Sequence, residues 1–306
     1  MGGGRRRLDE PGSRVLAHRV IGREEPAATR DSRHGVGMAR EAKRTRHGSR
    51  ALVALALLAL LAGALPGLEA QAPLRVALYR SGGVARDALD TAEALLEDAP
   101  GVELSVVRPR DVRRGALDGQ DAVLFTGGRG SVQGRLLGEA GRERVRRFVR
   151  GGGGYVGICA GAYLALQGEP EFHKIAFVAG RHATGDRWRR GVATVDVEDD
   201  AGGRHRLHYA NGPIFGAERV EGLAPYVPLA WFRSEIWRER HDTRPGEMVD
   251  TPAIVAARYG EGSAVLFSPN PTLEPTEDAL LLRALRFVAR AEVGPDTTFA
   301  DVFGAP

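Results

Sequence analysis

The sequence predicts an α/β protein whose main domain is a mainly parallel sheet with helices on both faces. Between residues 73 and 166, short apolar segments alternate with amphipathic ones, and glycine, proline or serine follows the apolar segments. Strands that alternate with helices at this spacing form parallel sheets with crossover connections. After residue 170, apolar segments follow one another without helices between them, which predicts an antiparallel extension of the sheet.

The individual elements follow from the same pattern. We expect strands at 73–81, 102–109, 120–128 and 154–158, and helices at 85–98, 110–117, 140–150 and 160–166. In the extension we expect strands at 191–199, 204–212 and 226–234, a hairpin over 252–268, and a final helix at 276–291. Thr276 is the expected N-cap of that helix. These elements make 73–291 one domain, followed by a loosely packed tail at 292–306.

The charge of the chain is unevenly distributed. Residues 1–50 carry 13 Lys and Arg against 6 Asp and Glu, whereas residues 71–306 carry 30 against 32. The basic excess therefore belongs to the leader, and the folded part has no overall attraction to nucleic acid. In "RWRR" (187–190) an aromatic residue stands among arginines, but four residues do not make a nucleic-acid site, and we expect a solvated hairpin there.

The apolar segment that follows the basic leader has the layout of a secretory signal. Residues 51–65 are apolar, basic residues precede them, and small residues follow up to Ala70. We therefore predict a signal peptide at 51–70 and an exported protein, periplasmic or secreted. Because Met38 stands close to the apolar run, we expect translation to start there, with 1–37 an over-extended gene prediction. The alternative is a membrane anchor formed by an uncleaved leader.

The chain has one cysteine, Cys159, in a segment that predicts a sharp turn. The segment Gly157-Ile158-Cys159-Ala160-Gly161 lies between an expected strand and an expected helix. Small residues two before and two after a nucleophile allow strand and helix to approach closely, as in a nucleophile elbow. The alternative is a structural cysteine at a tight turn.

The predicted turn also implies donors for an oxyanion. The helix N-terminus is expected to lower the pKa of the thiol, and the N–H of Ala160 is expected to face a developing negative charge. A second donor is expected from Gly127 or Gly128, which follow the neighbouring strand. Arg129, next in the chain, is a candidate for holding a carboxylate, against the alternative of a solvated arginine.

Several segments together resemble a known family. "GGGYVGICAGAYLA", with "FTGG" before it and "YANGPIF" and "VLFSPNPTLEPTED" after it, looks like the N-terminal domain family of biotin-protein ligase, in the class I glutamine amidotransferase-like superfamily. The resemblance covers about 73–290 and implies a flavodoxin-like fold. It also implies a Cys–His–Glu triad in which the cysteine attacks an amide. No ligase domain follows, so we expect no biotin transfer.

The sequence departs from that triad after the last expected strand. The histidine position holds Asn270 and the glutamate position holds Thr272, with Glu274 the nearest carboxylate. An amide cannot accept a thiol proton near neutral pH. The predicted function is thus an exported amidotransferase-like domain that acts on or binds a small amide or carboxylate ligand. The alternatives are a binding module without turnover and a thiol-based redox sensor.

Other candidate residues have simpler explanations. The histidines that could replace the missing base are His173, His182, His205, His208 and His241, and a surface or structural role is the alternative for each. His205 and His208 fall on opposite faces of a strand, and no cluster suggests a metal or a cofactor. Asn211 is a ligand candidate, although the Asn-Gly-Pro sequence favours a turn.

Overall fold

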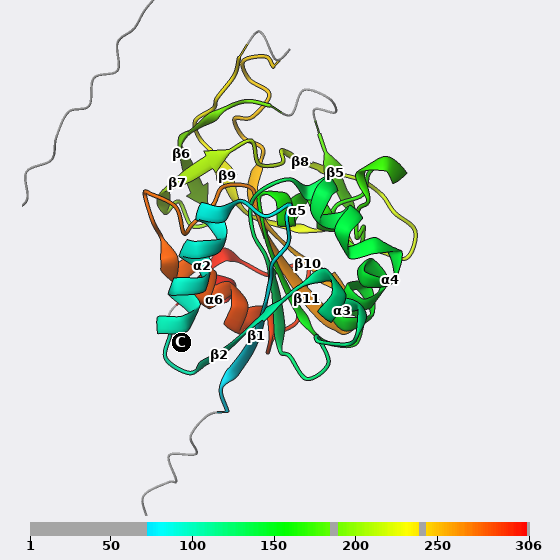
Figure 1. Cartoon of the computed structure of the whole chain (residues 1–306). Coiled ribbons are helices and arrows are strands. Elements are labelled where there is room, and N and C mark those ends of the chain that lie inside the picture. The colour runs from blue at the N-terminus through cyan, green and yellow to red at the C-terminus, as the bar shows by residue number, and fades with distance from the viewer. Residues whose placement is uncertain (1–71, 184–188, 239–242, 305–306) are drawn as a thin grey trace, which may run out of the picture. The chain divides into compact units, whose positions relative to one another are not determined.

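A nine-stranded sheet forms the centre of the protein (Figure 1). The computed structural model describes residues 72–183, 189–238 and 243–304. The strand order is β2-β1-β3-β4-β11-β10-β9-β6-β7. A separate two-stranded sheet pairs β5 (Gly180–His182) with β8 (Phe215–Ala217).

Five neighbouring strands form a parallel half. They are β1 (Leu74–Tyr79), β2 (Val102–Val107), β3 (Ala122–Phe125), β4 (Gly154–Ile158) and β11 (Gly262–Phe267). All pairings among them are parallel. Their order, β2-β1-β3-β4-β11, is the 2-1-3-4-5 order of flavodoxin-like folds. The predicted fold class is therefore confirmed.

Helices cover both faces of this half because alternate side chains of each strand point to opposite faces. The helices are α2 (Arg86–Asp98), α3 (Pro109–Arg113), α4 (Gly130–Arg150), α5 (Ala160–Ala165) and α6 (Asp278–Val288), with a 3₁₀ turn η1 at Pro170–Phe172. The apolar residues of α2 and α6 pack with Val76 and Leu78 of β1. Those of α3 and α4 pack with Ala77 and Tyr79 of the same strand.

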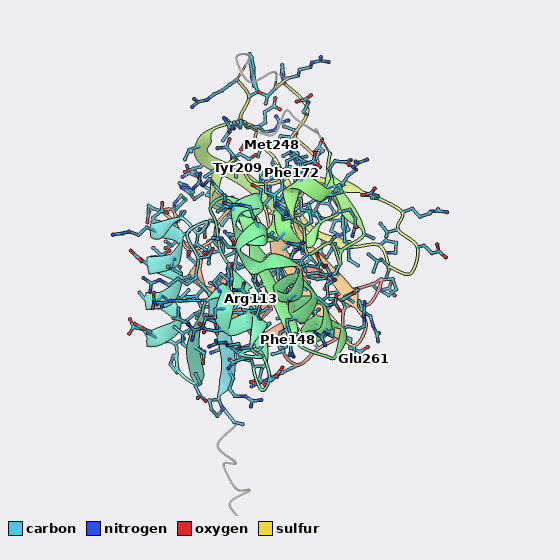
Figure 2. The ribbon with its side chains drawn as sticks, turned by 45° about the vertical axis from the view of Figure 1, so that its right-hand side comes forward. Arg113, Phe148, Phe172, Tyr209, Met248 and Glu261 are labelled. Carbon is cyan, nitrogen blue, oxygen red and sulfur yellow. The ribbon has the colours of Figure 1, made fainter. Side chains whose placement is uncertain are left out.

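Helix α4 begins ten residues before the predicted start and bends at Gly138, whose φ is 67°. The bend frees carbonyl groups of the first half of the helix, and arginine side chains bind them. Nη1 of Arg113, labelled in Figure 2, donates to the carbonyl oxygens of Leu136 and Leu137 at 3.0 Å each. The sequence prediction began at residue 140 because Gly138 interrupts the helical pattern.

The antiparallel extension consists of β6 (Val192–Asp199), β7 (Arg204–Ala210), β9 (Val227–Phe232) and β10 (Pro252–Tyr259). Every pairing in it is antiparallel, as predicted. The outermost strand of the extension, β7, contacts the segment that follows β11. There the N–H of Asn270 donates to the carbonyl of His208 at 2.7 Å. The extension therefore curls over the carboxyl ends of the parallel strands.

Two predictions near the C-terminus are wrong. The N-cap of α6 is Glu277 rather than Thr276. The segment after residue 291 is not loosely packed, because α7 (Phe299–Phe303) buries Phe299 and Phe303 against the core. A capping box between Thr298 and Asp301 starts this short helix, and five residues were too few to give a periodic pattern.

The predictions for the leader concern residues 1–71, which lie outside the described residues. Within the described ranges, no helix combines the length and the apolar composition that a membrane crossing requires.

Candidate functional site

Cys159 lies at the turn between β4 and α5, at the carboxyl edge of the parallel strands. Its backbone has φ 50° and ψ −100°, a region that non-glycine residues seldom adopt. Its N–H donates to the carbonyl of Phe267, the last residue of β11, at 2.8 Å. The neighbouring strand therefore holds the strained conformation in place.

The glycines on either side of Cys159 are required by the closeness of strand and helix. A Cβ on Gly161 would lie 2.0 Å from the carbonyl oxygen of Phe125, and one on Gly157 would lie 2.7 Å from the carbonyl carbon of Gly161. Neither position accepts a side chain without moving backbone. Gly157 and Gly161 thus stand where strand β4 and helix α5 come close together and to β3.

Two backbone N–H groups lie close enough to Cys159 to lower the pKa of its thiol. They belong to Gly128, in the loop after β3, and to Ala160, the first residue of α5, and both favour the thiolate. Gly127 is also adjacent, since a Cβ at that position would lie 3.8 Å from the Cβ of Cys159. Of the three predicted oxyanion donors, Gly128 and Ala160 are therefore the two that act on the pKa of the thiol.

The prediction of an acidic thiol is wrong in direction. Burial raises the pKa of Cys159 to about 11, and the N–H groups of Gly128 and Ala160 offset only part of that shift. The thiol donates to the carbonyl oxygen of Ala210, at the end of β7, at 3.5 Å. Cys159 as a whole residue is partly exposed. Its sulfur, however, is poorly solvated, so the thiol stays protonated near neutral pH.

The segment after β11 holds an amide and a hydroxyl where a triad would have its base and acid. Oδ1 of Asn270 accepts hydrogen bonds from the N–H and from the hydroxyl of Thr272, both at 2.9 Å. Asn270 is only 5% exposed. The two positions thus contact each other, but neither side chain can take up a proton near neutral pH.

Glu274, predicted as a catalytic carboxylate, is not brought to Cys159. Its side chain is exposed, and its carbonyl oxygen accepts a hydrogen bond from Nδ1 of His208 at 3.3 Å. Arg129 is likewise exposed and precedes α4. Asn211 has φ 55°, and its Oδ1 accepts from the N–H of Gly191 at 2.8 Å, so it forms a turn.

Three of the four histidines in the described ranges have ring hydrogen bonds to groups other than the sulfur. His205 lies between Asp199 and Glu277, with ring nitrogens 3.2 Å and 2.7 Å from their carboxylates. His173 packs its backbone against α4. His208, as predicted, lies on the opposite face of β7 from His205. His241 lies outside the described residues.

His182, the fourth, is held neutral. Its Nδ1 accepts from the N–H of Ile214 at 3.1 Å, so the proton of the neutral ring is on Nε2. Burial lowers its pKa to about 4, and the charge of Lys174 adds to this. Its ring packs edge-on against that of Tyr163, four residues after Cys159, at 5.3 Å.

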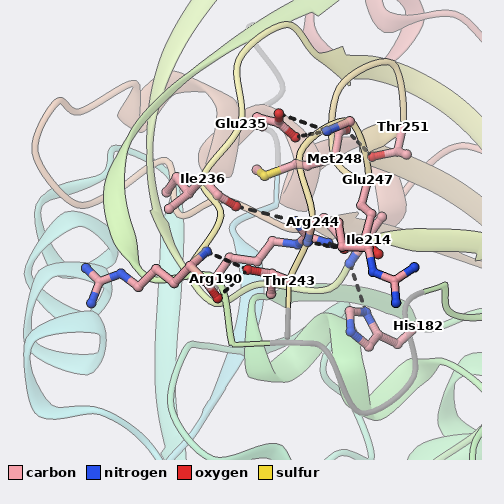
Figure 3. A network of polar contacts seen from close by, with 12 residues as sticks. His182, Arg190, Ile214, Glu235, Ile236, Thr243, Arg244, Glu247, Met248 and Thr251 are labelled. Atoms are coloured by element: carbon pink, nitrogen blue, oxygen red, sulfur yellow. Dashed lines mark hydrogen bonds and ion pairs between the residues drawn. The ribbon is translucent and has the colours of Figure 1, made fainter. Parts of the chain in front are cut away.

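Sequence reasoning missed a buried cation near this site. Arg190 has no exposed surface, and Figure 3 shows it in a polar network with Glu247, whose Oε2 it binds at 2.8 Å, and with the carbonyl of Ile236. Its charge acts on Tyr163 and Tyr209 and opposes the burial that raises the pKa of each. The prediction of a solvated hairpin is therefore wrong for Arg190; no local pattern distinguishes a buried arginine from an exposed one.

In the residues that the structure describes, no group of His, Cys, Asp and Glu side chains could hold a metal ion.

An open depression of about 630 Å³ is lined by Leu74, Arg75 and Asp121, among others. It lies where β1 and β3 begin, at the opposite end of the parallel strands from Cys159.

The strand order defines the class: the described domain is a flavodoxin-like α/β domain. Residues 78–183 match the family model described as "Biotin-protein ligase, N terminal". The predicted resemblance is therefore confirmed over that segment, which includes Cys159 and the Gly127–Gly128 loop.

No curated protein matches the sequence. A structure described as a glutamine amidotransferase is 22% identical, with a TM-score of 0.48, over 71% of this chain and 98% of that chain. PurLQS from Thermotoga maritima is 16% identical, with a TM-score of 0.46, over 72% of this chain and 92% of that chain. The fold class rests on the strand order.

Proposed function

We propose that the chain is an exported amidotransferase-like domain that binds a small amide or carboxylate ligand at Cys159 without hydrolysing it. The observation that carries this proposal is the contact between Asn270 and Thr272 at the two positions that correspond to the triad histidine and glutamate. Neither side chain titrates near neutral pH, so the pair provides no acceptor for a thiol proton.

The chemistry around the sulfur suits an oxygen-bearing ligand. The N–H groups of Gly128 and Ala160 are two convergent donors, and such donors bind carbonyl or carboxylate oxygens. The raised pKa of Cys159 keeps the thiol neutral, so the sulfur does not repel an anionic ligand. A neutral thiol beside two donors therefore favours binding over attack.

A cysteine-dependent amidase is the second candidate, and the backbone of Cys159 favours it. A positive φ at a strand-to-helix turn, with glycine two residues before and after, is the geometry of a nucleophile elbow. In that reaction the thiol gives up its proton, the sulfur attacks the amide carbon while the N–H groups of Gly128 and Ala160 bind the oxygen, ammonia leaves with that proton, and water then hydrolyses the thioester. The redox-sensor alternative is disfavoured, because a thiol with a pKa of about 11 is rarely ionised near neutral pH.

The single cysteine allows a direct test. Iodoacetamide labels Cys159 alone, and mass spectrometry measures the rate of labelling in the presence of L-glutamine, L-glutamate or acetate. We expect at least one of them to slow the labelling, with no ammonia released from glutamine. Ammonia release that is abolished in Cys159→Ala would establish the amidase instead, and labelling unaffected by all three compounds would refute the ligand site.

The export part of the proposal depends on the leader at 1–70, with the basic and apolar pattern given above. N-terminal sequencing of the protein from periplasm and medium should find a start close to residue 71. A product that retains the leader in the membrane fraction would favour the anchor. Production that persists when the Met38 codon is changed would refute a start at Met38.

A further inference from the structure

The peptide that joins Gly127 to Gly128 has a fixed direction. The carbonyl oxygen of Gly127 accepts from the N–H of Ala85 at 3.0 Å and from Nε2 of Gln133 at 3.4 Å. In a planar trans peptide, the carbonyl and the following N–H point in opposite directions. The N–H of Gly128 therefore points away from these two donors, in a loop that adjoins Cys159 and whose Gly128 N–H lowers the pKa of the thiol.

We propose that Gln133 is a positioning residue that holds this peptide in the direction that presents the Gly128 N–H to Cys159. Gln133 lies in the first turn of α4 and has no exposed surface. Its Nε2, which carries two hydrogens, lies within hydrogen-bond distance of three carbonyl oxygens, those of Thr126 at 3.2 Å, Gly127 at 3.4 Å and Gly83 at 3.4 Å, so at least one of the hydrogens is shared. The role rests on the proposed function of Cys159 as the group that meets the ligand.

The orientation of the Gln133 amide follows from its surroundings. Three carbonyl oxygens converge on one nitrogen, and a reversed amide would place Oε1 against all three of them. The hydroxyl of Tyr79 donates to the backbone carbonyl of Gln133 at 3.2 Å, which adds a further restraint on the helix turn. The donor end of the side chain is thus directed at the loop after β3.

The loop needs such a restraint because of its glycines. Gly128 has φ 134°, and a Cβ there would lie 2.2 Å from the carbonyl oxygen of Gly83. Glycine is therefore obligatory at Gly128, and Gly127 precedes it in the chain. A peptide with glycine on both sides has few steric barriers to reversal, and reversal would remove the donor from Cys159.

A second observation indicates that Gln133 is not merely filling space. Its Oε1 is buried and has no hydrogen-bond partner in the described part of the chain. An unpaired buried carbonyl destabilises a fold, so an apolar side chain would serve packing better. The nitrogen of the same amide binds the carbonyl of the Gly127–Gly128 peptide.

The test compares two glutamines. Gln133→Met keeps the length of the side chain and removes its donors, whereas Gln120→Met makes the same change at the other end of β3, where Oε1 is also buried and unpaired. We expect Gln133→Met to slow iodoacetamide labelling of Cys159 at pH 8 roughly tenfold. Without Gln133 the Gly127–Gly128 peptide can reverse, and the Gly128 N–H then no longer stabilises the thiolate. Gln120→Met should label at the wild-type rate. Labelling requires neither ligand nor turnover, so this result is independent of whether the proposed ligand binds.

Two outcomes would overturn the proposal. One is a labelling rate for Gln133→Met within about twofold of wild type, and the other is equal slowing in both variants. If Gln133→Met does not fold, Ala85→Pro removes the other donor to Gly127 at a residue whose φ of −71° proline accepts. Slower labelling in Ala85→Pro supports the fixed peptide direction, and wild-type labelling refutes it.

Discussion

The two halves of the sheet contribute differently to the surroundings of Cys159. The parallel half forms the strained turn and supplies both N–H donors, through Gly128 and Ala160. The antiparallel extension supplies what covers the sulfur, beginning with the carbonyl of Ala210 at the end of β7. A strained turn with two nearby N–H groups therefore lies beneath a layer whose burial of the sulfur raises the pKa of the thiol.

The largest effect on stability is expected from a substitution in the parallel half, at the turn that holds Cys159. Gly161→Ala would place a methyl group against the carbonyl of Phe125, and because that oxygen belongs to strand β3 it cannot move aside. We expect the free energy of unfolding to fall by about 4 kcal/mol. Urea denaturation followed by circular dichroism would measure it.

Gly294→Ala is the matched control, since a Cβ there meets nothing within 4 Å. It should change stability by less than about 1 kcal/mol. Equal effects of the two substitutions would mean that strand β3 and the turn are not as close as described.

The next effect concerns His182, in the separate sheet of β5 and β8, and depends on pH. The pKa of His182 is about 4 in the folded protein, below the unfolded value of 6.5, so the unfolded chain binds the proton more readily. The stability that neutral His182 provides is present above pH 6.5 and is lost as the pH falls toward 4. The loss should reach about 3 kcal/mol at pH 4.

The measurement is the free energy of unfolding between pH 7 and pH 4 for the wild type and for His182→Gln. The stability difference between the two proteins should change by about 3 kcal/mol across this range. Parallel curves would show that His182 is not held neutral by its surroundings.

A third change acts where the two halves meet. Asn270→His would put an imidazole on the residue that bridges β7 and the segment after β11. The resemblance implies that a histidine at this position takes the proton of the thiol. Iodoacetamide labelling of Cys159 at pH 7 should therefore become roughly tenfold faster. Asn270→Leu, which has no proton acceptor, should not accelerate labelling; equal rates in the two variants would contradict the correspondence with the triad.

The smallest effect is expected from Thr272→Val, which keeps the shape and removes the hydroxyl that binds Oδ1 of Asn270. The hydroxyl also lies 3.2 Å from Oγ1 of Thr91, and the loss of both hydrogen bonds should cost about 1 kcal/mol. A double-mutant cycle with Asn270→Ala isolates the contact, and a coupling energy of zero would show that it contributes nothing to stability.

The parallel half could be predicted from sequence because its elements are local. The strand at 154–158 was predicted with its observed bounds, and α2 within one residue of its observed start. The glycines around Cys159 were informative because the turn requires them. Periodicity failed where an element was short, as in α7, or interrupted, as in α4.

The environment of Cys159 could not be predicted in the same way. Its raised pKa depends on burial beneath the extension, and the contact with Ala210 joins residues that are 51 positions apart in the chain. The helix N-terminus was a correct local argument, but desolvation outweighed it. Likewise, the burial of Arg190 depends on Glu247 and Ile236, which the local sequence around it does not contain.

The position of β11 has a consequence for any shortened form of the protein. The segment that matches the family model ends at residue 183, but β4 pairs on one side with β11, which begins at Gly262. All five residues of β4 are buried. A chain truncated after residue 183 would display that strand as an open apolar border, and we expect it to self-associate rather than remain monomeric.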